Sequence, residues 1–292
     1  MIPAAFEYAA PKTIAEALAL LRGKDGEGKI LAGGQSLIPM MRFRLASPSL
    51  LIDIMRIPEL RVFKEEAGYL RIGAAVTHAQ VESSATIREG YPLLFSAVGI
   101  IADPVVRNRG TICGSLVHAD PAGDWGAALL AARAEAVVVG PEGERRIPLD
   151  EFLADAFTTV LKPDELLSEV RVPTPGPRSG GNYQKIERKV GDFATAGVGV
   201  QIMLNAQGTV EQAGIGLCAA GPISRRAAAA ERMLTGKMLD DATIAAAEAA
   251  AQADPTADTR GPADYKKDMF RVLTARALRA VRAAVEASGG RT

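Results

Sequence analysis

The chain has 292 residues, of which 48% are hydrophobic and 23% charged, as is usual for a folded globular protein. Its 34 Lys and Arg residues balance its 34 Asp and Glu residues, so no basic excess is available to hold a nucleic acid backbone. With two cysteines and two histidines, the chain cannot build an iron–sulfur cradle alone and shows no spacing typical of a metal site, so we expect no bound metal.

The two ends of the sequence give no membrane signal. The N-terminal residues MIPAAFEYAAPKT lack a basic stretch followed by an apolar one, so they do not resemble a secretory signal. Charges interrupt the Ala-rich tracts near the C-terminus before these reach a membrane-spanning length. We therefore expect a cytoplasmic protein.

In the first half of the chain, short helices are predicted to alternate with short apolar strands. Thr13, Ser36 and Thr77 are each expected to cap a helix, and Thr13 forms a capping box with Glu16. The predicted helices begin at these caps or at later polar residues and span residues 13–21, 37–43, 77–81, 92–102 and 124–132. The predicted strands, some paired as hairpins, span residues 29–32, 49–54, 62–64, 69–72, 136–139 and 145–148.

A Pro- and Gly-rich segment at 173–181 (PTPGPRSGG) predicts a domain boundary. Beyond it, alternating or continuously apolar stretches predict strands at 183–188, 196–204 and 210–218. Ala-rich helices are predicted to follow them at 225–234, 240–251 and 262–286. The second half of the chain is therefore predicted to be an α+β module.

Two glycine-centred segments, at 32–37 (AGGQSL) and 109–125 (RGTICGSLVHADPAGDW), are candidates for ligand binding. Each places small residues and a hydroxyl where backbone N–H groups can converge on an anion. Neither matches GxGxxG or GxxxxGK[ST]. A Gly-Gly turn after a strand is often only a turn, but two such segments together favour a pyrophosphate gripped from both sides, as in FAD, NAD or CoA. Asp124 could accept a hydrogen bond from a ribose or ribityl hydroxyl.

Longer motifs around these segments resemble one known family. The sequences at 32–54, 105–131, 185–196 and 258–278 are similar to those of the FAD-binding medium subunit of molybdenum hydroxylases, the aerobic carbon monoxide dehydrogenase and xanthine dehydrogenase family. The resemblance covers the whole chain. It implies an α+β fold with a vanillyl-alcohol-oxidase (PCMH)-type FAD-binding domain of two subdomains, followed by a C-terminal α+β domain. The implied FAD-binding domain spans 1–175, with subdomains at about 1–55 and 56–175, and the C-terminal domain spans 180–288.

The resemblance also implies a function and partners. The flavin of such a subunit takes electrons from two [2Fe–2S] clusters on a small subunit and passes them to an external acceptor, while a large subunit holds the molybdenum cofactor. The implied assembly is a dimer of heterotrimers. Two alternatives stay open: a self-sufficient FAD-dependent oxidase or dehydrogenase of the vanillyl-alcohol-oxidase type, and a non-catalytic nucleotide-binding module. The first needs a base over the flavin, and no histidine lies near Phe193 in the sequence.

Site residues follow from the same resemblance, position by position. Residues 32–36 and 111–115 would hold the pyrophosphate, and Asp124 the ribityl or ribose region. Ile101 and Leu161 would pack near the cofactor, and Lys185 would give a basic contact to it. No catalytic and no metal-binding residue is assigned. The full set of candidate FAD-binding residues is Lys29, Ala32, Gly33, Gly34, Gln35, Ser36, Leu37, Ile101, Gly110, Thr111, Cys113, Gly114, Ser115, His118, Gly123, Asp124, Leu161, Lys185, Asp192 and Phe193.

Three residues bear on how the cofactor would be held. Cys113 replaces the first glycine of the T-I-G-G motif of the family, which would cost roughly 1 kcal/mol if this position required a positive φ. Phe193 stands where carbon monoxide dehydrogenase flavoproteins often have Tyr in a G-D-Y-A-T segment, which leaves the carbon monoxide assignment open. His118 could carry a covalent flavin link, but a role in capping the loop or beside the phosphate is favoured.

Overall fold

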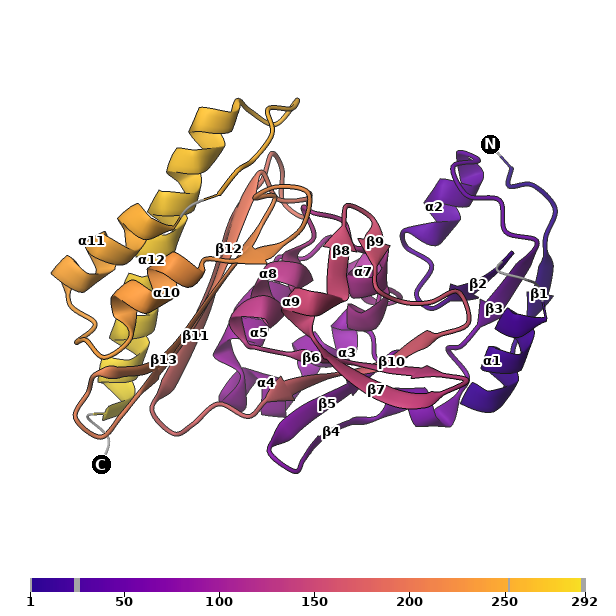
Figure 1. The fold of residues 1–292 in the computed structure, drawn as a ribbon, viewed down its shortest axis with the longest axis horizontal. Coiled ribbons are helices and arrows are strands. Elements are labelled where there is room, and N and C mark those ends of the chain that lie inside the picture. The colour runs from indigo at the N-terminus through magenta and orange to yellow at the C-terminus, as the bar shows by residue number, and fades with distance from the viewer. Residues whose placement is uncertain (1, 24–26, 252, 290–292) are drawn as a thin grey trace.

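The computed structural model describes residues 2–23, 27–251 and 253–289, and three parts follow one another along its long axis (Figure 1). The N-terminal part, in indigo and violet, is a small parallel sheet with strand order β1-β3-β2 and two helices beside it. Its strands are β1 (Glu7–Ala9), β2 (Gly28–Leu31) and β3 (Leu50–Asp53). Its helices are α1 (Ile14–Arg22), whose buried face lies against β2 and β3, and α2 (Leu37–Arg42), which follows β2 directly.

The middle part is built on a five-stranded antiparallel sheet with strand order β4-β5-β10-β6-β7. Its strands are β4 (Phe63–Glu66), β5 (Tyr69–Gly73), β6 (Glu135–Gly140), β7 (Gly143–Pro148) and β10 (Leu166–Pro173). The helices are η1 (Pro58–Arg61), α3 (His78–Ser83), α4 (Ala85–Gly90), α5 (Pro92–Val98), α6 (Pro104–Arg107), α7 (Ile112–His118), α8 (Asp124–Ala131) and α9 (Leu149–Phe152). A two-stranded sheet of β8 (Leu153–Asp155) and β9 (Thr158–Thr159) completes this part.

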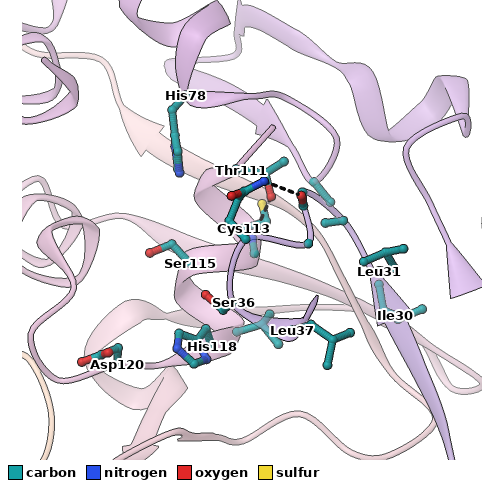
Figure 2. A pocket seen from close by; sticks show the side chains of 18 of the residues that line it. Ile30, Leu31, Ser36, Leu37, His78, Thr111, Cys113, Ser115, His118 and Asp120 are labelled. Atoms are coloured by element: carbon teal, nitrogen blue, oxygen red, sulfur yellow. Dashed lines mark hydrogen bonds between the residues drawn. The ribbon is translucent and has the colours of Figure 1, made fainter. Parts of the chain in front are cut away.

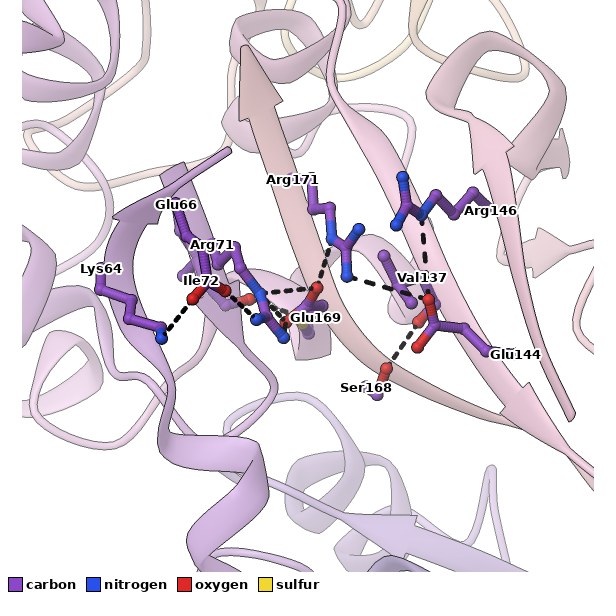
Figure 3. A network of polar contacts seen from close by, with 11 residues as sticks. Lys64, Glu66, Arg71, Ile72, Val137, Glu144, Arg146, Ser168, Glu169 and Arg171 are labelled. Carbon is purple, nitrogen blue, oxygen red and sulfur yellow. Dashed lines mark hydrogen bonds and ion pairs between the residues drawn. The ribbon is translucent and has the colours of Figure 1, made fainter. Parts of the chain in front are cut away.

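A ladder of alternating charges crosses the five-stranded sheet (Figure 3). Its centre is Glu169 on β10, which is 3% exposed and accepts hydrogen bonds from the guanidinium groups of Arg71 and Arg171. Arg71 lies on β5, directly opposite Arg171 in the strand register, so one carboxylate satisfies both cations. The ladder runs from β4 to β7 through Lys64, Glu66, Arg71, Glu169, Arg171, Glu144 and Arg146.

The C-terminal part is an antiparallel sheet with strand order β11-β12-β13-β14. Its strands are β11 (Ser179–Ile186), β12 (Ala196–Leu204), β13 (Val210–Cys218) and β14 (Arg225–Arg226). Three helices cover one face: α10 (Ala228–Leu234), α11 (Asp241–Ala250) and α12 (Ala263–Gly289). Helices α5 and α8 of the middle part cover the other face, so this sheet lies between two layers of helices (Figure 1).

Glycines on the C-terminal sheet allow α8 to approach it closely. A Cβ atom at Gly214 would lie 1.9 Å from the carbonyl oxygen of Ala131, and one at Gly216 would lie 2.0 Å from that of Ala127. Such distances are far below van der Waals contact, so only glycine fits at both positions. The backbone of α8 therefore rests directly on β13, which fixes the start of α8 relative to the C-terminal part.

The mixed α+β fold expected from the sequence is present, and most predicted elements occur within a few residues of their expected bounds. Several short elements and strand β10 were not predicted, and four details of the predicted ones differ. Residues 112–118 of the second glycine-centred segment form helix α7 rather than a loop, and Arg225 and Arg226 form strand β14 rather than the start of a helix. Helix α5 ends at Val98 instead of continuing to 102. Ser36 stands at the helix start, but its hydroxyl makes no capping hydrogen bond.

Within residues 2–23, 27–251 and 253–289, no helix is long and apolar enough to cross a membrane.

Candidate functional site

A cavity of about 420 Å³ opens where the N-terminal and middle parts meet (Figure 2). Residues 29–37 line it from the N-terminal side, helix α7 from the middle part, and residues 191–193 from the C-terminal part. Apolar side chains make up much of its wall, as in most small-molecule sites. The candidate residues derived from the sequence all line this cavity except Gly123 and Lys185.

The two glycine-centred segments meet backbone to backbone at this cavity. A Cβ atom at Gly33 would lie 2.2 Å from the carbonyl oxygen of Arg109 and 2.6 Å from the Cα atom of Gly110. Gly34 has a φ of 75°, in the left-handed region that favours glycine. The sequence therefore needs both glycines, one for the close approach and one for the turn that leads into α2.

Helix α7 presents its first turn and its hydroxyl-bearing residues to the cavity. Thr111 caps the helix, and its Oγ1 accepts a hydrogen bond from the N–H of Gly114 at 3.0 Å. Ser115, one helical turn further on, lines the same cavity as Ser36 (Figure 2). The N–H groups of Ile38 and Gly114 are bonded within the protein, so the donor set that suits a pyrophosphate consists of these hydroxyls and the first N–H groups of α2 and α7.

Cys113 lies within α7 and has no positive φ, so its side chain costs no backbone strain. The thiol is buried against the sheet, where Sγ lies 3.7 Å from the carbonyl oxygen of Ile72. Burial raises the pKa of the thiol far above its ordinary value, so Cys113 stays protonated. The position acts as a small packing residue behind the cavity.

Asp124 is held from behind by the C-terminal part. Its carboxylate accepts a hydrogen bond from the Tyr183 hydroxyl at 2.7 Å and pairs with the Lys185 ammonium at 3.3 Å. Burial raises the pKa of Asp124, and the charge of Lys185 opposes this rise. Each carboxylate oxygen has a second lone pair, so Asp124, which lines the cavity, can also accept a hydrogen bond from a ligand hydroxyl.

Lys185 and Gly123 lie next to the cavity without lining it. The side chain of Lys185 is only 1% exposed, and its ammonium donates to the carbonyl oxygens of Ile100 and Asp192 at 2.9 and 3.0 Å. Its hydrogen-bond partners are thus protein groups, and it supports two segments that line the cavity. Gly123 precedes α8 as its N-terminal cap residue and borders a small neighbouring recess.

His118 ends α7 at the opposite end of the cavity from His78 (Figure 2). Its ring lies 5.2 Å from that of Phe157, centre to centre, at an angle of 52°. Burial lowers the pKa of His118, so the ring is neutral near pH 7. Asp120 also lines the cavity here.

Several lining residues are not among the candidates, and among them His78 and Glu165 are buried and polar. The N–H of His78 donates to the carbonyl oxygen of Gly110 at 2.9 Å, and an isolated bridge joins Thr77 to Thr111. These contacts place the start of α3 beside the start of α7. Only the tertiary pairing brings the two segments together, so no local sequence signal could have found His78.

Two family models match the chain. The model described as the FAD binding domain in molybdopterin dehydrogenase matches residues 4–175. The model described as the CO dehydrogenase flavoprotein C-terminal domain matches residues 181–281. Together they account for most of the chain, including every segment that lines the cavity.

Characterised proteins and a solved structure are similar over nearly the full length. The carbon monoxide dehydrogenase medium chain of Hydrogenophaga pseudoflava is 44% identical over 282 residues, which cover 96% of this chain and 98% of the relative. The 6-hydroxypseudooxynicotine dehydrogenase complex subunit alpha of Paenarthrobacter nicotinovorans is 39% identical and covers 95% of each chain. A structure of the Hydrogenophaga pseudoflava carbon monoxide dehydrogenase lacking the Mo-pyranopterin moiety matches with a TM-score of 0.93, covering 97% of this chain and 99% of that one.

Proposed function

Because this chain belongs to the FAD-binding medium subunits of the molybdopterin dehydrogenases, we propose that its flavin takes electrons from the [2Fe–2S] clusters of a partner subunit and passes them to an external acceptor. The chain is the flavoprotein subunit of an oxidoreductase of the carbon monoxide dehydrogenase and xanthine dehydrogenase type. Bound FAD supplies the exchange of one or two electrons at one site. The protein's own residues bind and orient it.

The observation that carries this proposal is the backbone contact between Gly33 and Arg109 at the floor of the cavity. It brings the first turns of α2 and α7 to one place, where their N–H groups and the hydroxyls of Ser36, Thr111 and Ser115 would hold the pyrophosphate. Asp124 would accept a hydrogen bond from a ribityl or ribose hydroxyl, and Ile101 and Leu161 would pack on the rings. Lys185 would act from behind, through the segments that it supports.

The partners follow from the electron route. The sequence has only two cysteines, Cys113 and Cys218, and both are buried, so the iron–sulfur clusters must be on another chain. We propose a small subunit with two [2Fe–2S] clusters and a large subunit with the molybdenum cofactor, assembled as a dimer of heterotrimers. The large subunit would then choose the substrate.

The cofactor assignment is tested by titrating the full-length chain with FAD. Wild type should bind one FAD per chain, with its absorption bands shifted from those of free FAD. Gly33→Ala should reduce the affinity at least tenfold, because its Cβ atom forces the two segments apart. Gly90→Ala is the matched control, since nothing lies within 4 Å of a Cβ there, and it should bind like wild type. Equal binding by both variants would overturn the placement of the pyrophosphate.

The electron route needs the intact complex, purified through a tag on this chain. Its visible spectrum should show flavin bands over a broad iron–sulfur background. After FAD is removed, electrons from the substrate of the large subunit should still reduce the clusters but should no longer reach a dye acceptor, and added FAD should restore that step. Flavin bands without iron–sulfur absorption would instead favour a self-sufficient flavoenzyme, and a colourless complex would favour a nucleotide-binding module.

A further inference from the structure

A buried histidine of the cavity has one ring nitrogen bonded to the protein and the other directed to the site. His78 is 4% exposed and lines the cavity. Its Nδ1 accepts a hydrogen bond from the indole N–H of Trp125 at 3.1 Å. The two rings are stacked, with their centres 5.8 Å apart and an angle of 27° between their planes. Trp125 comes from α8, whose position the C-terminal sheet fixes.

This contact decides which nitrogen carries the proton. An indole N–H can only donate, so Nδ1 of His78 must offer a lone pair to Trp125. In the neutral ring, the single proton therefore lies on Nε2. Burial and the nearby charge of Arg107 lower the pKa of His78 to about 4, which keeps the ring neutral at physiological pH.

The Nε2 edge of the ring lies beside the start of α7. A Cβ atom at Gly110 would lie 2.9 Å from Nε2, so glycine at this position makes room for the imidazole. None of the residues that the structure describes forms a hydrogen bond with Nε2. Nε2 is not among the buried side-chain atoms that lack a partner, so it is open to the cavity that His78 lines, where an acceptor atom of a ligand can reach it.

We propose that His78 is a neutral Nε2–H donor to an acceptor atom of bound FAD, and that Trp125 is the positioning residue that fixes this tautomer. The inference rests on the proposed function, because it needs FAD in this cavity. It adds a cofactor contact from a segment outside both glycine-centred motifs. A neutral donor suits the site, since it gives direction to the contact without adding a buried charge.

The composition of the chain makes the test direct, because it has only two histidines and one tryptophan. In the full-length chain labelled with ¹⁵N, one histidine should show an acceptor Nδ1 and a protonated Nε2, and His118→Gln assigns it to His78. Adding FAD should shift the Nε2 and Hε2 signals of His78 and leave the tautomer unchanged. If those signals do not move while FAD binds, the inference is wrong.

Paired substitutions test the contact by affinity. His78→Gln keeps an N–H group near the position of Nε2, whereas His78→Asn keeps one only near Nδ1. We expect FAD to bind about tenfold more weakly to His78→Asn, a difference of about 1.4 kcal/mol, and within about threefold of wild type to His78→Gln. Trp125→Phe should allow the Nδ1-protonated tautomer to appear and should weaken FAD binding several-fold.

The outcomes separate the two proposals. If wild type fails to bind FAD at all, both the proposed function and this inference are wrong. If wild type binds FAD, and His78→Asn and Trp125→Phe bind it equally well, only the inference is overturned. Circular dichroism identifies a variant that fails to fold, and in that case the signals of His78 in wild type decide the question alone.

Discussion

Among the individual residues, His78 links the cavity to the stability of the fold. Its pKa falls from an ordinary value near 6.5 to about 4, mainly because burial disfavours the charged ring and also because Arg107 repels it. Between these two pH values the unfolded chain takes up a proton that the folded chain does not. Stability contributed by the neutral ring is therefore present above about pH 6.5 and is lost as the pH falls toward 4.

We expect this effect to appear as a difference between wild type and His78→Gln. Wild type should lose about 2 kcal/mol of unfolding free energy between about pH 7 and pH 5 that His78→Gln does not lose. Urea unfolding of both FAD-free proteins at the two pH values measures the difference, in which the contributions of other titrating groups cancel. The same pH dependence in both proteins would mean that His78 titrates normally in the folded chain.

What could be predicted about single residues depended on how local their signal was. Gly33, Gly34 and Ser115 belong to short motifs, so their presence at the cavity could be inferred from contiguous sequence. The sequence could not predict where the Lys185 side chain points. Its ammonium donates to carbonyl oxygens of two segments that are distant from it or from each other in the sequence. His78 gave no signal at all, because its neighbour Gly110 lies 32 residues later and its partner Trp125 lies 47 residues later.

Among the helices and strands, α8 packs closely against the C-terminal sheet and also reaches the site. Its backbone lies on the glycine face of β13, while its first residues, Asp124 and Trp125, reach the cavity and His78. A substitution on β13 that displaces α8 should therefore weaken FAD binding, although the substituted residue does not contact the cofactor.

Gly216→Ala tests this coupling. Its Cβ atom would lie 2.0 Å from the carbonyl oxygen of Ala127, so α8 or β13 must move, at a cost of about 2 kcal/mol or more. We expect a lower melting temperature and a weaker affinity for FAD. Gly99→Ala is the control, because nothing lies within 4 Å of a Cβ there, and both properties should stay close to those of wild type. A stability loss without an affinity loss would show that α8 adjusts independently of the site.

The type of most elements could be predicted, but their pairing could not. The apolar pattern of β12 and β13 indicated strands with the observed bounds. Helix α7 was not predicted from the sequence, because glycine and hydroxyl-bearing residues are typical of a loop. The cap at Thr111 stabilises the start of this helix. Strand β10 was missed although it is the central strand of its sheet.

For the whole molecule, Lys185 holds the cavity together from the C-terminal part. Its ammonium pairs with Asp124 and donates to the carbonyl oxygens of Ile100 and Asp192, so a single cation bridges segments that line different walls. Removing the charge would leave the carboxylate of Asp124 buried with only Tyr183 as a hydrogen-bond donor, which is costly.

We expect Lys185→Met to lower the unfolding free energy by about 3 kcal/mol and to weaken FAD binding, although Lys185 does not line the cavity. Removing the cation should also raise the pKa of Asp124 further. Thermal unfolding and FAD titration measure both effects. Lys189→Met, at an exposed position four residues away, should change neither. Unchanged FAD affinity in Lys185→Met would show that the walls keep their places without this bridge.

The strand order of the middle part has a consequence for the timing of folding during synthesis. Strand β10 lies between β5 and β6 in space, yet the ribosome makes it last of the five. Until residue 173 has emerged, β5 and β6 each have an open edge with no neighbour to pair with. The cofactor site, which rests on this sheet and is closed by residues 191–193, can therefore form only late in translation. A nascent chain stopped before β10 should remain vulnerable to proteases and to aggregation, whatever the supply of FAD.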